Sequence, residues 1–200
     1  MINIVTTPPL ILASTSPYRK ALLERLGFDF ATRKPPYDEE KLKGLGLAPR
    51  ELARQLAAGK AESARHSPDE VLIGSDQLGA LETAPGQFEI LGKPGDREKN
   101  IAQLMRLGGR SHSLFTAVCV LYRDQRFEFM DETRITFRPL TEAEVTAVVD
   151  RDHPWDCAGG YKFEKAGITL IEKLECADPT AIEGLPLIQL STVLRGLGYL

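Results

Sequence analysis

The chain has 200 residues, 42% of them hydrophobic, and a formal net charge of -3. This composition provides a full hydrophobic core for a single domain over residues 1–200, and the acidic balance argues against nucleic acid as a partner. No apolar run approaches the roughly 20 residues that span a bilayer, and Met1 to Pro9 lacks the pattern of a secretory signal, which excludes a membrane protein and favours the cytoplasm.

The first predicted elements are a short strand and a helix. The apolar run from Leu10 to Ala13 is typical of a buried strand. Ser16 is predicted to cap a helix that begins at Pro17 and that Gly27 closes.

The start of this helix is a candidate phosphate site. Unpaired amides at a helix N-terminus attract anions, the hydroxyls of Ser14 and Ser16 add donors, and Arg19 adds a positive charge. The segment lacks the glycines and the Gly-Lys-Ser/Thr ending of a Walker P-loop, which argues against ordinary kinases and GTPases. Because Ser-x-Ser-Pro before a helix is often only a cap, these residues alone support phosphate binding and simple capping about equally.

The remaining elements alternate between helix and strand along the chain. This alternation predicts an α/β fold with a long mixed central sheet flanked by helices, with two lobes around a cleft as one arrangement. The predicted helices cover residues 49–66, 96–107, 141–150 and 186–197, and the third of these begins with a capping box. The predicted strands cover residues 71–75, 88–91, 113–122, 127–137 and 168–174.

Asp76 is the most distinctive polar residue. It directly follows the apolar run 71–75, and open α/β sheets usually bind ligands at the ends of such strands, although the residue could simply cap the next turn. Asp38, Glu39 and Glu40 form an acidic cluster, and one or two of them could join Asp76 in holding magnesium through oxygen ligands. Acidic triplets are more often solvated surface.

Two lysines and one glycine-rich segment complete the candidates. Lys93 lies between Gly92 and Pro94 in a predicted rigid turn that could direct its ammonium at a phosphate, whereas Lys60 is placed on the polar side of its helix. Residues 156–164 combine paired glycines with aromatics, which suits either a loop near a flat ligand or an ordinary glycine turn.

Cysteines and histidines provide no predicted chemistry. Their spacing indicates neither a zinc site nor a catalytic triad, and the cysteines are predicted to be reduced, mostly packed thiols. The residues concerned are Cys119, Cys157, Cys176, His66, His112 and His153.

Seven ordered segments together resemble one family, the Maf-like nucleoside triphosphate pyrophosphatases, over nearly the whole chain. They are Ser14-Thr15-Ser16-Pro17-Tyr18-Arg19, Asp38-Glu39, Lys60, Gly74-Ser75-Asp76-Gln77, Gly92-Lys93-Pro94, Cys157-Ala158-Gly159 and Gly184-Leu185-Pro186-Leu187. The chain is most similar to the branch that hydrolyses 7-methyl-GTP, because Tyr18, Gln77 and Glu164 stand at the specificity positions. In the dTTP/UTP branch these positions typically carry arginine, threonine and glutamine.

The resemblance implies cleavage between the α and β phosphates to give a nucleoside monophosphate and pyrophosphate, a house-cleaning role against modified nucleotides. It implies a divalent cation, Mg or Mn, with Asp76 as the proton acceptor. Our hypothesis is that Glu39 and Asp76 jointly hold the ion, and since a carboxylate bound to magnesium is a poor base, Asp76 could instead be chiefly a metal ligand. Ser14, Ser16, Arg19, Lys60 and Lys93 would bind the triphosphate. The resemblance also makes a homodimer plausible.

The specificity positions have a physical rationale. A carboxylate at Glu164 can accept hydrogen bonds from both N1–H and the exocyclic amine of guanine. The N7-methylated base is positively charged, so the ring of Tyr18 could stack on it with a cation–π contribution of about 0.5 to 2 kcal/mol. The chain departs from the family pattern at Gly160, Tyr161 and Phe163, where serine, phenylalanine and serine are expected.

Two alternatives remain open on the sequence. The nearest is the same chemistry on dTTP, UTP or another nucleotide, which Tyr18 and Glu164 argue against. The other is a non-enzymatic regulator of septum formation, which would give Asp76, Lys93 and Arg19 no evident joint purpose.

Overall fold

A computed structural model describes residues 7–199 and places one seven-stranded mixed sheet at the centre of that part of the chain. The strands are β1 (Leu10–Leu12), β2 (Ala31–Thr32), β3 (Val71–Ala84), β4 (Gln87–Leu91), β5 (Ser111–Tyr122), β6 (Gln125–Phe137) and β7 (Ile171–Glu175). The helices are α1 (Pro17–Glu24), α2 (Glu40–Lys43), α3 (Pro49–Ser63), α4 (Arg97–Leu107), α5 (Glu142–Asp152) and α6 (Leu187–Gly196). Short 3-10 helices are η1 (Ala158–Gly160), η2 (Ala166–Leu170) and η3 (Pro179–Glu183).

The strand order is β2-β1-β3-β5-β6-β7, and β4 pairs with the distal part of β3. β1 runs parallel to β2 and β3, whereas β3, β5, β6 and β7 pair antiparallel in that order. The predicted α/β fold with a mixed sheet flanked by helices is therefore confirmed.

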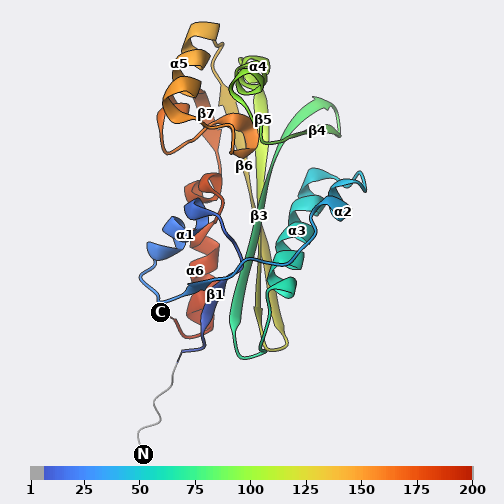
Figure 1. Ribbon diagram of the computed structural model, residues 1–200, viewed down its shortest axis with the longest axis vertical. Coiled ribbons are helices and arrows are strands. Elements are labelled where there is room, and N and C mark those ends of the chain that lie inside the picture. The colour runs from blue at the N-terminus through green and yellow to red at the C-terminus, as the bar shows by residue number, and fades with distance from the viewer. Residues whose placement is uncertain (1–6, 200) are drawn as a thin grey trace, which may run out of the picture.

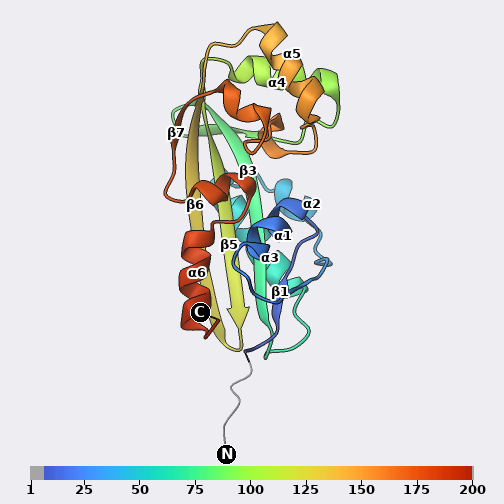
Figure 2. The same ribbon diagram turned by 90° about the vertical axis from the view of Figure 1, so that its left-hand side faces the viewer.

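Two lobes share the long strands β3, β5 and β6 (Figures 1 and 2). In the lobe nearer the N-terminus, α3 covers one face of the sheet while α1 and α6 cover the other (Figure 1). The opposite lobe contains α4, α5, β4 and β7. Each covering layer has its own group of buried apolar residues. One group includes Leu12 of β1 and Leu190 of α6, another includes Ala57 of α3 and Leu72 of β3, and the third includes Phe137 in the distal lobe.

Strand β3 is much longer than the predicted 71–75. Asp76 and Gln77 interrupt the apolar run but do not end the strand, because β5 continues to pair with them at Ala117 and Thr116. The prediction that Asp76 ends a strand was therefore wrong. The strand that ends here is β1, whose last residue Leu12 pairs with Ile73. A carboxyl end of a parallel strand thus does lie beside Asp76, but it belongs to β1.

Other boundaries also differ from the predictions. The helix expected over 49–66 ends at Ser63, and the strand expected over 168–174 begins only at Ile171 because residues 166–170 form η2. The capping box of α5 is confirmed, since Thr141 accepts from the Glu144 amide and Glu144 accepts from the Thr141 amide. The short elements β2 and α2 were missed because too few residues carry a periodic pattern.

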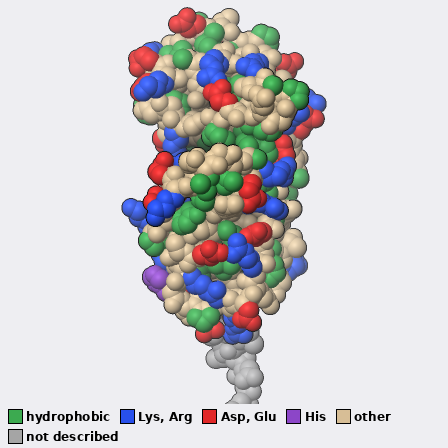
Figure 3. All heavy atoms as spheres, turned by 90° about the vertical axis from the view of Figure 1, so that its right-hand side faces the viewer, with side chains coloured by type: hydrophobic (Ala, Val, Ile, Leu, Met, Phe, Trp, Pro, Cys, Tyr) green, Lys and Arg blue, Asp and Glu red, His purple; other side chains and the backbone are tan. Residues whose placement is uncertain are grey.

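Three further observations concern the helices, the surface charges and the cysteines. None of the helices within residues 7–199 is both long and apolar enough to cross a bilayer. On the face shown in Figure 3, Lys and Arg side chains are interspersed with Asp and Glu. Cys119, Cys157 and Cys176 are free thiols, and only Cys119 is fully buried.

Candidate active site

A cleft of about 760 Å³ lies where the two lobes meet, a volume suited to a small-molecule ligand. Its walls come from the β1–α1 connection, α3, the middle of β3, the β4–α4 connection, the 156–164 segment and η3. All of the predicted site residues line it: Ser14, Ser16, Tyr18, Arg19, Glu39, Lys60, Asp76, Gln77, Lys93 and Glu164. The structure thus brings together residues from both lobes that are far apart in sequence.

The start of α1 has the predicted capping geometry. Ser16 Oγ accepts a hydrogen bond from the Arg19 amide at 3.4 Å, and Ser14 Oγ accepts one from the Ser16 amide at 3.1 Å. Each hydroxyl keeps its own proton available as a donor toward the cleft. Capping and phosphate binding are therefore compatible at this segment, because the same serines can serve both.

Lys60 and Asp76 form an ion pair at the floor of the cleft. Lys60 Nζ lies 2.5 Å from Asp76 Oδ1 and 3.0 Å from Glu39 Oε1, so one ammonium holds two carboxylates. Lys60 and Asp76 are only 7% and 6% exposed. Burial alone would raise the pKa of Glu39, but the charge of Lys60, with those of Lys43 and Arg19, lowers it.

Lys60 was wrongly placed on the polar side of its helix. It is buried because α3 packs unusually close to β3, where Gly74 has no side chain to hold the helix away. A Cβ at Gly74 would lie 2.2 Å from the Ala57 carbonyl oxygen, which no packed structure tolerates. This close approach brings the Lys60 ammonium on α3 to the carboxylate of Asp76, which follows Gly74 by two residues on β3.

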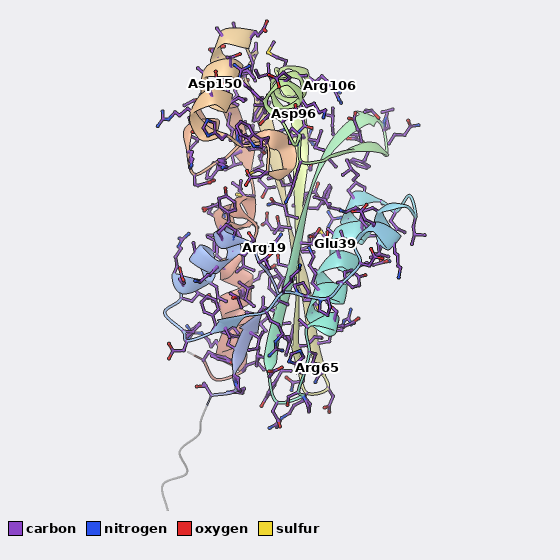
Figure 4. All side chains as sticks on the ribbon, viewed as in Figure 1. Arg19, Glu39, Arg65, Asp96, Arg106 and Asp150 are labelled. Carbon is purple, nitrogen blue, oxygen red and sulfur yellow. The ribbon has the colours of Figure 1, made fainter. Side chains whose placement is uncertain are left out.

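Arg19 enters the cleft from the opposite side of β3. Figure 4 shows Arg19 on α1 and Glu39 beside α2 on either side of that strand. Arg19 Nε donates to the Gly184 carbonyl at 3.0 Å, which fixes the guanidinium against η3. Burial lowers the pKa of Arg19, and the negative charges of Asp76 and Glu39 partly counteract this.

Gln77 is tied to η3. Its amide nitrogen donates to the carbonyls of Ala181 at 2.8 Å and Ile182 at 3.0 Å, and to Thr116 Oγ1 at 3.0 Å. With its nitrogen thus engaged, the side chain positions η3 as well as lining the cleft.

Tyr18 meets the distal lobe across the cleft. The ammonium of Lys162 lies 5.9 Å from the centre of the Tyr18 ring and 3.6 Å from Asp156 Oδ1. Burial would lower the pKa of Lys162, but its contact with Tyr18 and the charge of Asp156 raise it. A protein cation thus already lies close to the aromatic ring that the sequence assigns to the base.

The segment that carries Lys162 and Glu164 is anchored in the distal lobe. Asn100 Nδ2 donates to the Gly160 carbonyl at 2.7 Å, and the Tyr161 hydroxyl lies 2.9 Å from His112 Nε2. Gly160 has φ +78° and its Cβ position would meet Asn100 Nδ2 at 2.5 Å. Glycine and tyrosine at 160 and 161, where the family pattern predicts serine and phenylalanine, therefore have a local structural reason.

The acidic pair Glu39 and Asp76 fits a divalent cation. The two carboxylates converge on one point, as their shared contact with Lys60 shows. Within residues 7–199 there is no cluster of three His, Cys, Asp or Glu side chains arranged to hold a metal. Magnesium, however, is commonly bound by one or two carboxylates together with substrate phosphates and water, which is the donor set available here.

Sequence reasoning missed several charged cleft residues, among them Lys162 and Glu183. Lys162 lies inside the glycine-rich segment that was singled out, and Glu183 directly precedes the Gly184-Leu185-Pro186-Leu187 motif. Their positions beside recognised motifs were the available signal, but neither residue follows a pattern of its own.

Comparisons with known proteins agree on one family. Residues 9–197 match the model of the family described as Maf-like protein. A protein of Bdellovibrio bacteriovorus named 7-methyl-GTP pyrophosphatase is 46% identical over 186 residues, covering 93% of this chain and 95% of that protein. Proteins of the same name are 43% identical over 196 residues in Polaromonas sp. and 41% identical over 192 residues in Vibrio vulnificus. These alignments cover 96% and 94% of this chain and 86% and 95% of the relatives.

Proposed function

The chain belongs to the Maf-like proteins, and on that basis we propose that it is a pyrophosphatase that converts 7-methyl-GTP to 7-methyl-GMP and pyrophosphate. The names of its relatives in Bdellovibrio, Polaromonas and Vibrio support this substrate. The observation that carries the proposal is the convergence of Lys60, Asp76 and Glu39 in a cleft that also contains Arg19 and Lys93.

The triphosphate binds to the cationic side of the cleft. Arg19, held by Gly184, and the hydroxyls of Ser14 and Ser16 supply donors from the start of α1. Lys93 lines the cleft from the β4–α4 connection and forms no ion pair within the described residues 7–199. These groups offset the negative charge that the triphosphate brings and the charge that shifts to the leaving pyrophosphate.

Asp76 is the group that acts on water. Its Oδ1 is held by Lys60, which leaves Oδ2 as the oxygen that can accept a proton or a hydrogen bond from the attacking water. Water adds to the α-phosphorus, the α–β bridging oxygen leaves with pyrophosphate, and the proton passes to Asp76 or to solvent.

A magnesium or manganese ion completes the proposed site. Glu39 and Asp76 would hold it, in exchange for part of their contact with Lys60. Such an ion, when bound, supplies positive charge to the phosphate oxygens and so stabilises the transition state.

The base lies toward the distal lobe. There Tyr18 offers an aromatic face and Glu164 offers an acceptor pair for the guanine edge. The same chemistry on dTTP or UTP is the second candidate, and a carboxylate at position 164 disfavours it because the O4 edge of uracil presents an acceptor beside N3–H.

The setting we propose is the cytoplasm. Three free thiols, Cys119, Cys157 and Cys176, suit a reducing compartment. The homodimer that the family resemblance makes plausible stays a prediction, which size-exclusion chromatography with light scattering would test.

The test is a nucleotide panel. Pyrophosphate release with magnesium is measured from 7-methyl-GTP, GTP, dTTP, UTP and CTP, and kcat/KM is compared. We expect the highest value for 7-methyl-GTP. A preference for a pyrimidine nucleotide would keep the chemistry and overturn the base assignment, whereas no release from any nucleotide would favour the septum-regulator hypothesis.

A further inference from the structure

Some acidic residues of the cleft form ion pairs and others do not. Among its acidic side chains, Glu39 and Asp76 share Lys60, and Asp156 pairs with Lys162. Glu164 and Glu183 also line the cleft, but within residues 7–199 neither makes a hydrogen bond or an ion pair through its carboxylate. The cleft therefore carries two carboxylates that form no ion pair with a lysine or arginine of residues 7–199.

These two carboxylates come from segments that are far apart in sequence. Glu164 is the last residue of the glycine-rich segment 156–164, and Glu183 is the last residue of η3. Burial raises the pKa of Glu183, and the negative charge of Glu164 adds to this rise. Arg25 opposes this only from the exposed end of α1.

The backbone beside Glu183 is held firmly from the sheet. Ser75 Oγ donates to the Gly184 carbonyl at 2.9 Å, and Thr116 Oγ1 donates to the Ala181 carbonyl at 2.9 Å. Gln77 adds its bonds to Ala181 and Ile182. Side chains from β3 and β5 thus fix the backbone from which Glu183 extends, and its half-buried side chain lines the cleft.

Glu164 is exposed at the cleft and Glu183 is half-buried there, so two like charges line the same cleft. They repel each other, and a ligand with a positive charge relieves that repulsion. Lys162 does not supply this charge because Asp156 already pairs with it. This inference rests on the proposed function, in which the ligand is a nucleotide. A nucleotide whose purine is methylated at N7 has a positively charged base.

We propose that Glu183 is a second specificity-determining residue, which acts with Glu164 to select a positively charged base over its neutral counterpart. Glu164 reads the hydrogen-bond donors of the guanine edge, which methylated and unmethylated guanine share. Glu183 contributes the negative charge that distinguishes between them.

The experiment compares kcat/KM for 7-methyl-GTP and GTP in the wild type and in Glu183→Gln, which removes the charge and keeps the shape. We expect the ratio of the two values to fall about fivefold, mainly through the KM for 7-methyl-GTP, since one partly buried charge contact is changed. Glu183→Asp keeps the charge and should retain more of the ratio than Glu183→Gln. Glu172→Gln, an exposed site on β7 outside the cleft, makes the same charge change and should leave the ratio unaltered.

The outcomes separate this proposal from the proposed function. A wild type that prefers 7-methyl-GTP, together with an unchanged ratio in Glu183→Gln, overturns the role of Glu183 alone. A wild type without that preference overturns both proposals about the base. If thermal unfolding shows that Glu183→Gln does not fold, the ratio of kcat/KM for 7-methyl-GTP and GTP is measured in Glu183→Met instead.

Discussion

Lys60 on α3 and Asp76 on β3 form a buried ion pair, with 2.5 Å between Nζ and Oδ1. Glu39 joins the pair from the N-terminal end of α2. One lysine thus pairs with two carboxylates and offsets part of the cost of burying negative charge there.

Removal of this ammonium should destabilise the fold. Lys60→Met leaves Asp76 buried without a partner, and we expect the free energy of unfolding to fall by about 3 kcal/mol. The double variant Lys60→Met/Asp76→Asn should recover part of this loss, because no buried charge is then left unpaired. Urea unfolding measures both, with the exposed Lys41→Met as the control. A loss no larger than that of Lys41→Met would contradict the buried pair.

Divalent metal should be required for turnover. We expect EDTA to abolish pyrophosphate release and either magnesium or manganese to restore it. Glu39→Gln, which removes one of the two proposed ligands, should raise the metal concentration needed for half-maximal activity about tenfold. An unchanged metal requirement in this variant would remove Glu39 from the proposed metal site.

Glu164→Gln should weaken discrimination more than chemistry. An amide donates as well as accepts, so it loses one of the two hydrogen bonds from the guanine edge. We expect the preference for 7-methyl-GTP over UTP to fall about tenfold, while kcat for 7-methyl-GTP changes less. Steady-state kinetics with both nucleotides provide the measurement, and an unaltered preference would argue against base recognition by Glu164.

His112 should make stability sensitive to acid. Burial lowers the pKa of His112 from its ordinary value of 6.5 to about 4. Between these values the unfolded chain binds a proton that the folded protein does not, so stability falls as the pH falls through this window, by up to about 3 kcal/mol. His112→Gln removes this titration, and its stability should decline less steeply from pH 6.5 to 4. Urea unfolding at several pH values tests this, and curves of equal steepness would be inconsistent with a buried neutral histidine.

Local patterns predicted much of the fold because most elements carry their own signals. Ser16 and Thr141 marked helix starts, and the runs 113–122 and 127–137 predicted the strands that the structure shows as β5 and β6. The length of β3 could not be predicted in the same way, since Asp76 and Gln77 interrupt its apolar pattern for reasons that lie in the cleft.

Site residues that belong to recognisable sequence motifs could be predicted. Features of the site that depend on tertiary packing were missed. Burial of Lys60 depends on the close approach of α3 at Gly74, a tertiary contact that helical periodicity does not encode. Glu183 likewise joins the cleft only because Ser75, Gln77 and Thr116 draw η3 against the sheet.

The most direct test identifies the products of 7-methyl-GTP in the wild type and in Asp76→Asn by phosphorus NMR. We predict 7-methyl-GMP and pyrophosphate in equal amounts from the wild type, and at least a hundredfold slower release from Asp76→Asn at every magnesium concentration, with its fold intact by thermal unfolding. Release of orthophosphate and a nucleoside diphosphate, or full activity in Asp76→Asn, would contradict α–β hydrolysis directed by Asp76.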